Sequence, residues 1–204
     1  MIKVNLSAMY IKEIEHKLGG LKSEAPKVLA KAVNVTAKQA RKELQMEAKK
    51  TYTVKAGKFN KAMKIKNAKK SRPEATITAK GSTMPLSDFK VTPKAPIQNG
   101  TDAASAKVLK ANRLKSLVLS GGEKSGKDLK AFVAKFASGH VAVVQRVPGK
   151  KMKSKNKEAL KEFYSVSIPK MIGNEKRVYG KVKPIIRDNL KGNIDNQIKK
   201  IIGE

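Results

Sequence analysis

The stretch from Ala131 to Val147, AFVAKFASGHVAVVQRV, constrains the fold more than any other part of the chain. Its two halves alternate in side-chain character with a period of two, which is typical of β-strands that bury one face. Ser138 and Gly139 lie between the halves, where a hairpin needs a tight turn. A half-buried hairpin has to pack against other elements. The sequence therefore predicts a small antiparallel sheet built around a central β-hairpin at residues 131–147.

Helical patterns at both ends of the chain predict the elements that cover this sheet. Apolar residues recur at helical spacing within 6–18, and a second apolar stripe from about Ser23 to residue 44 runs opposite regularly spaced lysines. A third stripe extends from Pro184, which suits a first helical turn, to residue 202. Gly192 interrupts that stripe at a cost of about 1 kcal/mol relative to Ala. We expect an α+β fold with long N-terminal and C-terminal helices.

Several shorter segments complete the expected organisation. Strand patterns occur at 2–6, 74–79, 90–92 and 116–120, whereas 158–164 is interpreted as a helical turn that leads into an extended piece at 165–168. A length of 204 residues suits one domain, so we predict a single domain over residues 1–204. Within it, Pro93 to Lys107 is predicted to be a mobile loop and Pro148 to Lys157 a basic loop.

The charge of the chain predicts a polyanionic partner. It has 46 Lys and Arg against 16 Asp and Glu, a formal net charge of +30, and such a chain attracts nucleic acid or an acidic protein surface. Tyr52 and Phe59 are too few for a base-stacking platform, so a nucleic acid would be bound by its phosphates without sequence preference. Two blocks, neither containing an acidic residue, supply the predicted contacts: Lys49, Lys50, Lys55, Lys58, Lys61, Lys64, Lys66, Lys69, Lys70, Arg72, Lys150, Lys151, Lys153, Lys155 and Lys157.

Composition argues against catalytic, metal and membrane functions. The chain has no Cys, which excludes disulfides, thiolate metal sites and Cys nucleophiles. His16 and His140 are the two histidines, and neither has an obvious sequence partner for acid–base catalysis, so a solvated or structural role is expected for both. No apolar run approaches the roughly 18 residues of a membrane span. We expect a protein that is not an enzyme and that needs no metal or cofactor.

The segment GGEKSGK at Gly121 to Lys127 has the spacing of a phosphate-binding loop. The next residue is Asp128, where that motif needs a Ser or Thr hydroxyl to hold Mg²⁺. We therefore interpret the segment as a glycine-rich turn between strands and expect no nucleotide site there.

Four segments are informative together. They are AVNVTAKQARKE at 32–43, YTVK at 52–55, which is expected to open a basic helix, MPLSDF at 84–89, and AFVAKFASGHVAVVQRVPGK at 131–150. In this order they resemble the minor tail protein Z family of tailed bacteriophages. The last segment is the most specific, because a Phe-containing strand, a Gly turn and a Val strand ending in Gln-Arg-Val and Gly-Lys occur together. Residues 93–107 and 151–164 depart from the family pattern, yet the resemblance covers most of the chain.

The resemblance implies a structural virion protein at the head-proximal end of a phage tail. Such a protein completes the tail, helps it to join a filled head and seats the DNA end. A ring is implied, expected as a homohexamer by analogy with the sixfold tail, with tail terminator, connector and tail tube proteins as partners and no membrane. Localisation would be the tail or neck of the virion, after assembly in the host cytoplasm.

Two alternatives stay open at this point. The charge would equally suit a cellular, ribosomal-like protein that binds nucleic acid without sequence preference. The lysines could also dock on an acidic tail or connector protein and never contact DNA.

Overall fold

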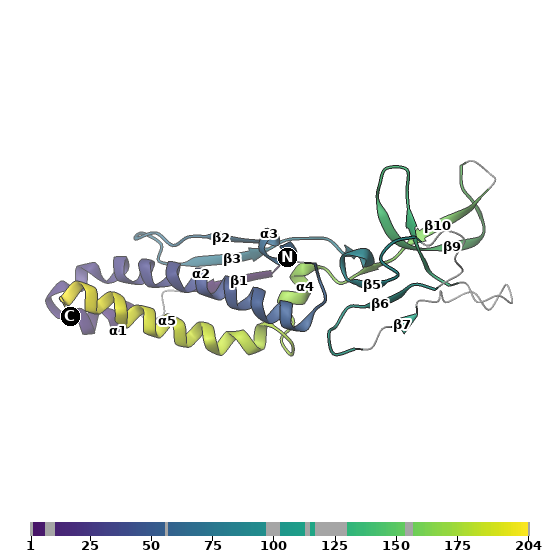
Figure 1. Cartoon of the computed structure of the whole chain (residues 1–204). Coiled ribbons are helices and arrows are strands. Elements are labelled where there is room, and N and C mark those ends of the chain that lie inside the picture. The colour runs from purple at the N-terminus through teal and green to yellow at the C-terminus, as the bar shows by residue number, and fades with distance from the viewer. Residues whose placement is uncertain are drawn as a thin grey trace. The chain divides into compact units, whose positions relative to one another are not determined.

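Figure 1 shows the computed structural model, which describes residues 2–6, 11–55, 57–96, 103–112, 115–116, 130–153 and 157–203. The chain divides into two compact units, and each is described by itself. Unit 1 comprises Met1–Lys50, Gly57–Ser82 and Ile168–Glu204, and unit 2 comprises Thr51–Ala56 and Thr83–Ser167. Long helices and small antiparallel sheets are both present, which confirms the α+β class. Among the described helices, none combines the length and apolarity that crossing a membrane requires.

Unit 1 combines a three-stranded sheet with two long helices. Its elements are β1 (Ile2–Leu6), α1 (Ile11–Leu18), the 3-10 helix η1 (Gly19–Glu24), α2 (Ala25–Thr51), α3 (Lys58–Ala62), β2 (Met63–Lys66), β3 (Ala75–Ala79), α4 (Ile168–Ile172) and α5 (Tyr179–Ile202). The sheet is antiparallel with the order β1-β3-β2. Ile77 on the central strand stands opposite Val4 on one side and Ile65 on the other.

Helix α2 lies between the sheet and α5 (Figure 1). It contacts both neighbours through polar side chains, because Asn34 bonds the β2–β3 connection at Ala68 and Thr36 accepts a hydrogen bond from Asn193 of α5. The buried side chains of α2 are mostly small. They are Ala25, Val28, Leu29, Ala30, Ala32, Val33, Thr36, Ala37, Ala40, Leu44 and Ala48. The lysines of the predicted opposite side, including Lys31 and Lys38, are exposed as expected.

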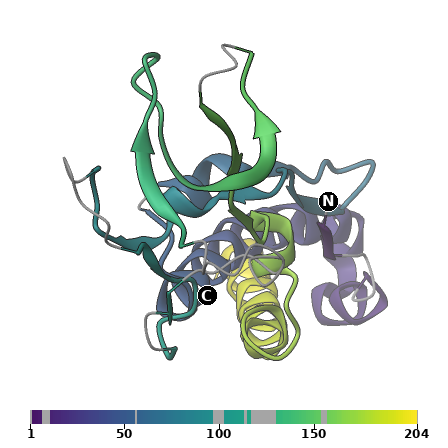
Figure 2. The same cartoon turned by 90° about the vertical axis from the view of Figure 1, so that its right-hand side faces the viewer.

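The described part of unit 2 contains three small antiparallel sheets. Its elements are β4 (Met84–Pro85), η2 (Leu86–Asp88), β5 (Lys90–Thr92), β6 (Ser105–Lys107), β7 (Lys115–Ser116), β8 (Phe132–Lys135), β9 (Val141–Lys151), β10 (Glu158–Glu162) and β11 (Tyr164–Ser165). The sheets have the orders β10-β9-β8, β5-β6-β7 and β11-β4. In Figure 2 the strands β8, β9 and β10 are strongly curved.

The predicted hairpin is confirmed as β8–β9. Phe132 stands opposite Val144 and Lys135 opposite Val141. The turn is closed by a hydrogen bond of 2.8 Å from the amide of Phe136 to the carbonyl of His140, and Gly139 has a φ of +80°, which favours glycine. The strands expected at 2–6, 74–79 and 90–92 are confirmed as β1, β3 and β5.

Some predicted elements differ from the structure. The helical turn predicted at 158–164 is wrong, because Glu158–Glu162 pairs with β9 as strand β10. The same pairing carries β9 through Lys151, so Pro148 to Lys151 of the predicted basic loop are strand residues. In the predicted mobile loop, Ser105–Lys107 form β6, whereas 97–102 lie outside the described residues. Of the strand expected at 116–120, Ser116 belongs to β7 and 117–120 lie outside the described residues.

The structure also differs from the prediction at the start of two helices. Helix α5 begins at Tyr179, so Pro184 lies inside it rather than in its first turn. Asn174 supports the earlier start, because its carbonyl accepts hydrogen bonds from the amides of Val178 and Tyr179, both at 2.9 Å. Ile168, expected to be extended, opens the short helix α4.

Gly180 and Gly192 give a matched pair of stability predictions for α5. A Cβ added at Gly192 meets no atom within 4 Å, so Gly192→Ala should raise the free energy of unfolding by about 0.5–1 kcal/mol. A Cβ at Gly180 would lie 2.2 Å from the carbonyl oxygen of Glu175, so Gly180→Ala should lower it by roughly 1–3 kcal/mol. Urea unfolding followed by the helical circular dichroism signal measures both. Shifts of the same sign would contradict this placement of α5.

Candidate polyanion-binding surface

Seven residues of the first basic block lie on one continuous segment of unit 1. They extend from the short helix α3 through strand β2 into the β2–β3 connection, and every one of them is exposed. We call them the basic face of unit 1: Lys58, Lys61, Lys64, Lys66, Lys69, Lys70 and Arg72.

Strand β2 places two of these lysines beside threonine residues. Lys64 and Lys66 alternate with the core-directed positions of β2, so both project from the same side of the sheet. In the antiparallel register Lys64 stands opposite Thr78 and Lys66 opposite Thr76, and both threonines are half-buried. Ammonium groups beside hydroxyl groups suit contacts with phosphate oxygens.

The β2–β3 connection is held to helix α2 by one side chain. The Asn34 amide donates to the carbonyl of Ala68 at 3.0 Å, and its Oδ1 accepts from the amide of Ala68 at 2.7 Å. Within the connection, Lys69 and Arg72 exchange two backbone hydrogen bonds of 2.9 and 3.0 Å. The three basic residues of this connection are therefore carried by a fixed backbone.

Helix α2 adds two lysines next to this connection. Glu24, just before the helix, forms an ion pair of 2.8 Å with Lys27. The hydrogen bond from Lys27 lowers the pKa of Glu24, and the charges of Lys27, Lys70 and Lys31 lower it further. One carboxylate is thus surrounded by ammonium groups from α2 and from the β2–β3 connection.

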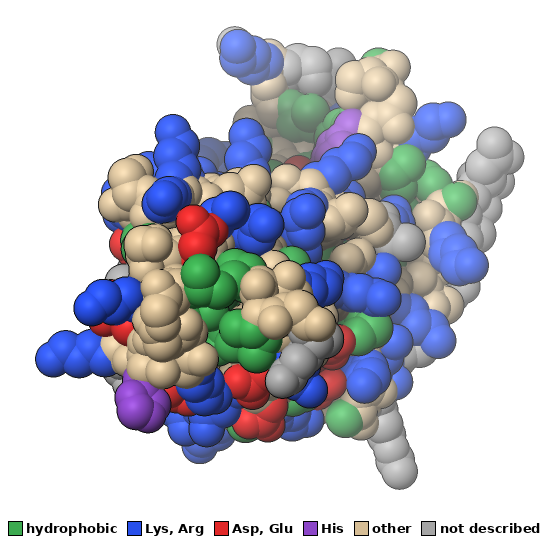
Figure 3. Space-filling model, turned by 90° about the vertical axis from the view of Figure 1, so that its left-hand side faces the viewer, with side chains coloured by type: hydrophobic (Ala, Val, Ile, Leu, Met, Phe, Trp, Pro, Cys, Tyr) green, Lys and Arg blue, Asp and Glu red, His purple; other side chains and the backbone are tan. Residues whose placement is uncertain are grey.

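Few carboxylates neutralise the basic face. Arg72 pairs with Glu74 at 3.1 Å. Five lysines of the face form no ion pair with any carboxylate that the structure describes: Lys61, Lys64, Lys66, Lys69 and Lys70. Figure 3 shows many Lys and Arg side chains around the end of unit 1 where α5 ends, with Asp and Glu side chains interspersed and an apolar patch near the centre.

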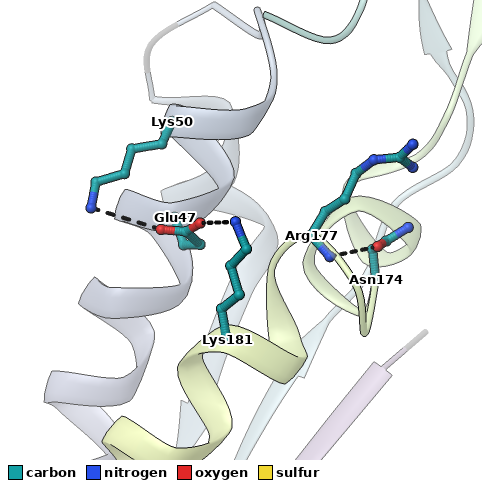
Figure 4. Close-up of polar contacts among 5 residues, drawn as sticks. All are labelled: Glu47, Lys50, Asn174, Arg177 and Lys181. Atoms are coloured by element: carbon teal, nitrogen blue, oxygen red, sulfur yellow. Dashed lines mark hydrogen bonds and ion pairs between the residues drawn. The ribbon is translucent and has the colours of Figure 1, made fainter. Parts of the chain in front are cut away.

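The remaining residues of the first block have other surroundings. Lys49 is exposed at the end of α2. Lys50 lies 3.7 Å from the carboxylate of Glu47, which also pairs with Lys181 of α5 at 3.2 Å (Figure 4). The charge of Lys50 is therefore partly compensated within the chain. Lys55 belongs to unit 2, where its ammonium-bearing side chain is exposed.

The second basic block lies in unit 2 at the end of the β9–β10 pair. Lys150 and Lys151 end strand β9, and Lys153 and Lys157 follow it, all exposed. A hydrogen bond of 2.8 Å from the amide of Met152 to the carbonyl of Lys157 brings the two sides of this connection together. Lys155 lies outside the described residues. The described lysines of the second block thus belong to a different unit from the basic face.

His140 has a neighbour that the sequence did not reveal. Its Nε2 lies 3.2 Å from Oε1 of Glu162 on β10, and its ring stacks on Phe136 with 5.8 Å between centroids. The Tyr164 hydroxyl donates to Oε2 of the same carboxylate at 3.1 Å, and this hydrogen bond raises the pKa of Tyr164. The contact joins β8–β9 to β10 and supports the structural role expected for His140.

Sequence reasoning missed the features that organise the basic face. Residues 52–55 were expected to open a basic helix, but α3 is five residues long and β2 follows it. The alternation of Met63 and Ile65 with lysines was the available signal for this strand. The Asn34 contact spans 34 residues of sequence and has no local signature. The segment GGEKSGK lies outside the described residues, and those that are described contain no cluster of three or more His, Asp or Glu able to hold a metal.

Asn34→Ala should loosen the basic face without removing any charge. The substitution leaves the amide and the carbonyl of Ala68 without their partner, which should lower the free energy of unfolding by about 1–3 kcal/mol. Hydrogen exchange at the Ala68 amide should accelerate more than exchange in β3. Asn196→Ala, an exposed position on α5, is the matched control and should change neither quantity. Unchanged protection at Ala68 would contradict the assigned role of Asn34.

The titration of Glu24 reports the positive potential at this surface. Lys70→Glu should raise the pKa of Glu24 towards its ordinary value, as followed by carboxyl ¹³C NMR. Because the pKa of folded Glu24 is below the unfolded value of 4.5, its interactions stabilise the fold above that pH and are lost as the pH falls through the folded-state pKa. Lys183→Glu, near the start of α5 where Lys181 contacts Glu47 at the other end of α2, should leave the titration unchanged. No shift with Lys70→Glu would mean that Lys70 is not close to Glu24.

The comparisons with known proteins identify the family. The family model of prophage minor tail protein Z matches residues 11–203 of this chain. Searches of curated proteins and of solved structures returned no match. The match spans both units, and it confirms the resemblance seen in the four sequence segments. The chain therefore belongs to the prophage minor tail protein Z family and has the role of a structural component of a phage tail.

Proposed function

We propose that this protein completes the head-proximal end of the phage tail, where it helps the tail to join a filled head and seats the end of the packaged DNA. It acts there as a ring, expected as a homohexamer because tails are sixfold, in contact with tail terminator, connector and tail tube proteins. In this proposal the whole chain works as one tail-completion domain without enzymatic activity. Family membership supports the location in the tail.

The observation that carries the DNA contact is the uncompensated charge of the basic face. Lys61, Lys64 and Lys66 are exposed, fixed on α3 and β2, and unpaired with any described carboxylate. Binding of phosphate groups to such lysines releases counterions, which favours association with DNA of any sequence. A virion protein at the end of a DNA channel needs this kind of contact, because it meets whichever sequence the genome end carries.

A ring of several copies would strengthen the electrostatic attraction between these lysines and DNA. Each copy carries a net charge of +30, so copies surrounding a channel would create a strong positive field along it. The second basic block, at the end of β9–β10, would add to the same field if it faces the channel. Such a field holds a duplex end electrostatically while leaving it free to move when the genome is ejected.

Charge reversal of the basic face tests this proposal. A variant with Lys61→Glu, Lys64→Glu, Lys66→Glu and Lys69→Glu should still assemble tails, but infectious titre should fall at least about tenfold and packaged DNA should become sensitive to nuclease. The matched control reverses four exposed lysines of α5, Lys183, Lys191, Lys199 and Lys200, with the same change of net charge. It should stay close to the wild type.

Electron microscopy of the particles separates the possible outcomes. Joined virions that lose DNA only in the basic-face variant support the DNA contact. Free heads and free tails in that variant would indicate an acidic protein partner instead of DNA. Normal, infectious particles in the complete absence of the protein would overturn the tail-completion role itself.

A further inference from the structure

Unit 2 contains a pocket that the proposed DNA contact does not use. It has a volume of about 310 Å³, within the range of small-ligand sites, and is formed by the η2–β5 segment and the β8–β9 hairpin. Its lining residues are Lys55, Ser87, Phe89, Lys90, Val91, Lys94, Val133, Val141 and Val143.

The floor of this pocket is apolar. Phe89 and Val91 come from η2–β5, and Val133 and Val143 are register partners on the hairpin. All four are buried, whereas Val141 is half-buried towards the opening. An apolar floor of this kind gains free energy when it receives an apolar side chain.

The opening of the pocket is positively charged. Lys55, Lys90 and Lys94 line it and are exposed. None of the three forms an ion pair with a carboxylate that the structure describes. The backbone of Lys55 and Lys90 is fixed, because the Lys55 amide donates to the carbonyl of Asp88 at 3.0 Å and the Lys90 amide to Oγ1 of Thr53 at 3.2 Å. Three ammonium groups around an apolar floor match an apolar residue flanked by carboxylates.

We propose that this pocket, called here the valine pocket, docks an acidic segment of a different protein through one apolar anchor residue. A phosphate backbone would satisfy the lysines but leave the valines uncovered, so a peptide fits better than DNA. A second copy of this chain is a poor source of such a segment, because it is strongly basic, with 46 Lys and Arg against 16 Asp and Glu.

The first experiment measures binding of a defined probe to the full-length protein. The probe is the peptide acetyl-Glu-Asp-Leu-Asp-Glu-amide, and the readout is the valine methyl NMR spectrum. The signals of Val91, Val133, Val141 and Val143 should shift and saturate, whereas Val28, Val33 and Val182 of unit 1 should not. A probe with Ala in place of Leu should bind at least about tenfold more weakly, since it lacks the apolar anchor.

Two variants of the protein separate the floor from the charged opening. Val141→Phe fills the pocket and should weaken binding about tenfold or more, and so should the triple variant Lys55→Glu, Lys90→Glu and Lys94→Glu. The control reverses Lys110, Lys151 and Lys161, which are exposed in unit 2 but do not line the pocket, and should change affinity less than twofold. Equal affinity for the Leu and Ala probes, or displacement of the peptide by a short DNA duplex at equal concentration, would overturn the proposal.

A second experiment identifies the occupant during assembly. The chain has no Cys, so Ser87→Cys gives a single attachment point for a photo-crosslinker at the pocket, and Ser138→Cys gives a control at the hairpin turn. Mass spectrometry should find Ser87→Cys joined to an acidic segment of another tail or head protein. Adducts with DNA, adducts with a second copy of this chain, or yields no higher than at the control position would each overturn it. These results do not depend on the DNA contact, which is tested on a different set of lysines.

Discussion

The packing of helix α2 on both of its sides is the interaction on which unit 1 depends. Small side chains such as Ala32, Ala37 and Ala40 are fully buried on α2, which lies between the sheet and α5. A core built this way draws its stability from many modest apolar contacts, because the chain has no Trp and few aromatic residues. Asn193 of α5 makes two hydrogen bonds that help to align α5 with α2. Asn193 donates to the buried Thr36 hydroxyl at 2.9 Å and to Gln39 at 2.7 Å.

This packing has to hold a chain whose surface charges repel one another. At an ionic strength of 0.1 M charges interact over about 10 Å, so neighbouring lysines on α2, α3 and β2 destabilise the folded state. Two acidic residues lie where helices meet: Asp195 of α5 contacts Lys17 of α1, and Glu47 of α2 contacts Lys181 of α5. Each exposed pair contributes little, about 0–1 kcal/mol. At the basic face, Glu74 pairs with Arg72, and the described ion pairs leave Lys61, Lys64 and Lys66 without a carboxylate partner.

Elements defined by local sequence patterns could be predicted from the sequence, whereas elements that depend on contacts between distant residues could not. The β8–β9 hairpin and the core of α2 were predictable because their periodicity is local and their boundaries carry Gly or a polar residue. Strand β10 was not, because EALKE is rich in helix-forming residues and pairing with β9 overrides that preference. Strand β2 was hidden by its lysines, and its partner β3 begins nine residues after it ends. For the candidate site, the sequence identified the lysines but not their division between two units, nor the Asn34 contact that fixes the β2–β3 connection.

The two sets of lysines differ in what lies beneath them, and this difference argues for different partners. Under Lys64 and Lys66 the exposed side of the sheet presents Thr76 and Thr78, a polar surface that hydrates well and can serve a phosphate backbone of any sequence. Between Lys55, Lys90 and Lys94 lies an apolar floor. Removing this apolar surface from water is favourable in free energy, so it favours binding of a complementary apolar side chain. A protein that joins a tail to a DNA-filled head has to recognise a polyanion without sequence preference and a protein neighbour with high specificity. Placing the two tasks on separate surfaces lets charge govern the first contact and shape govern the second.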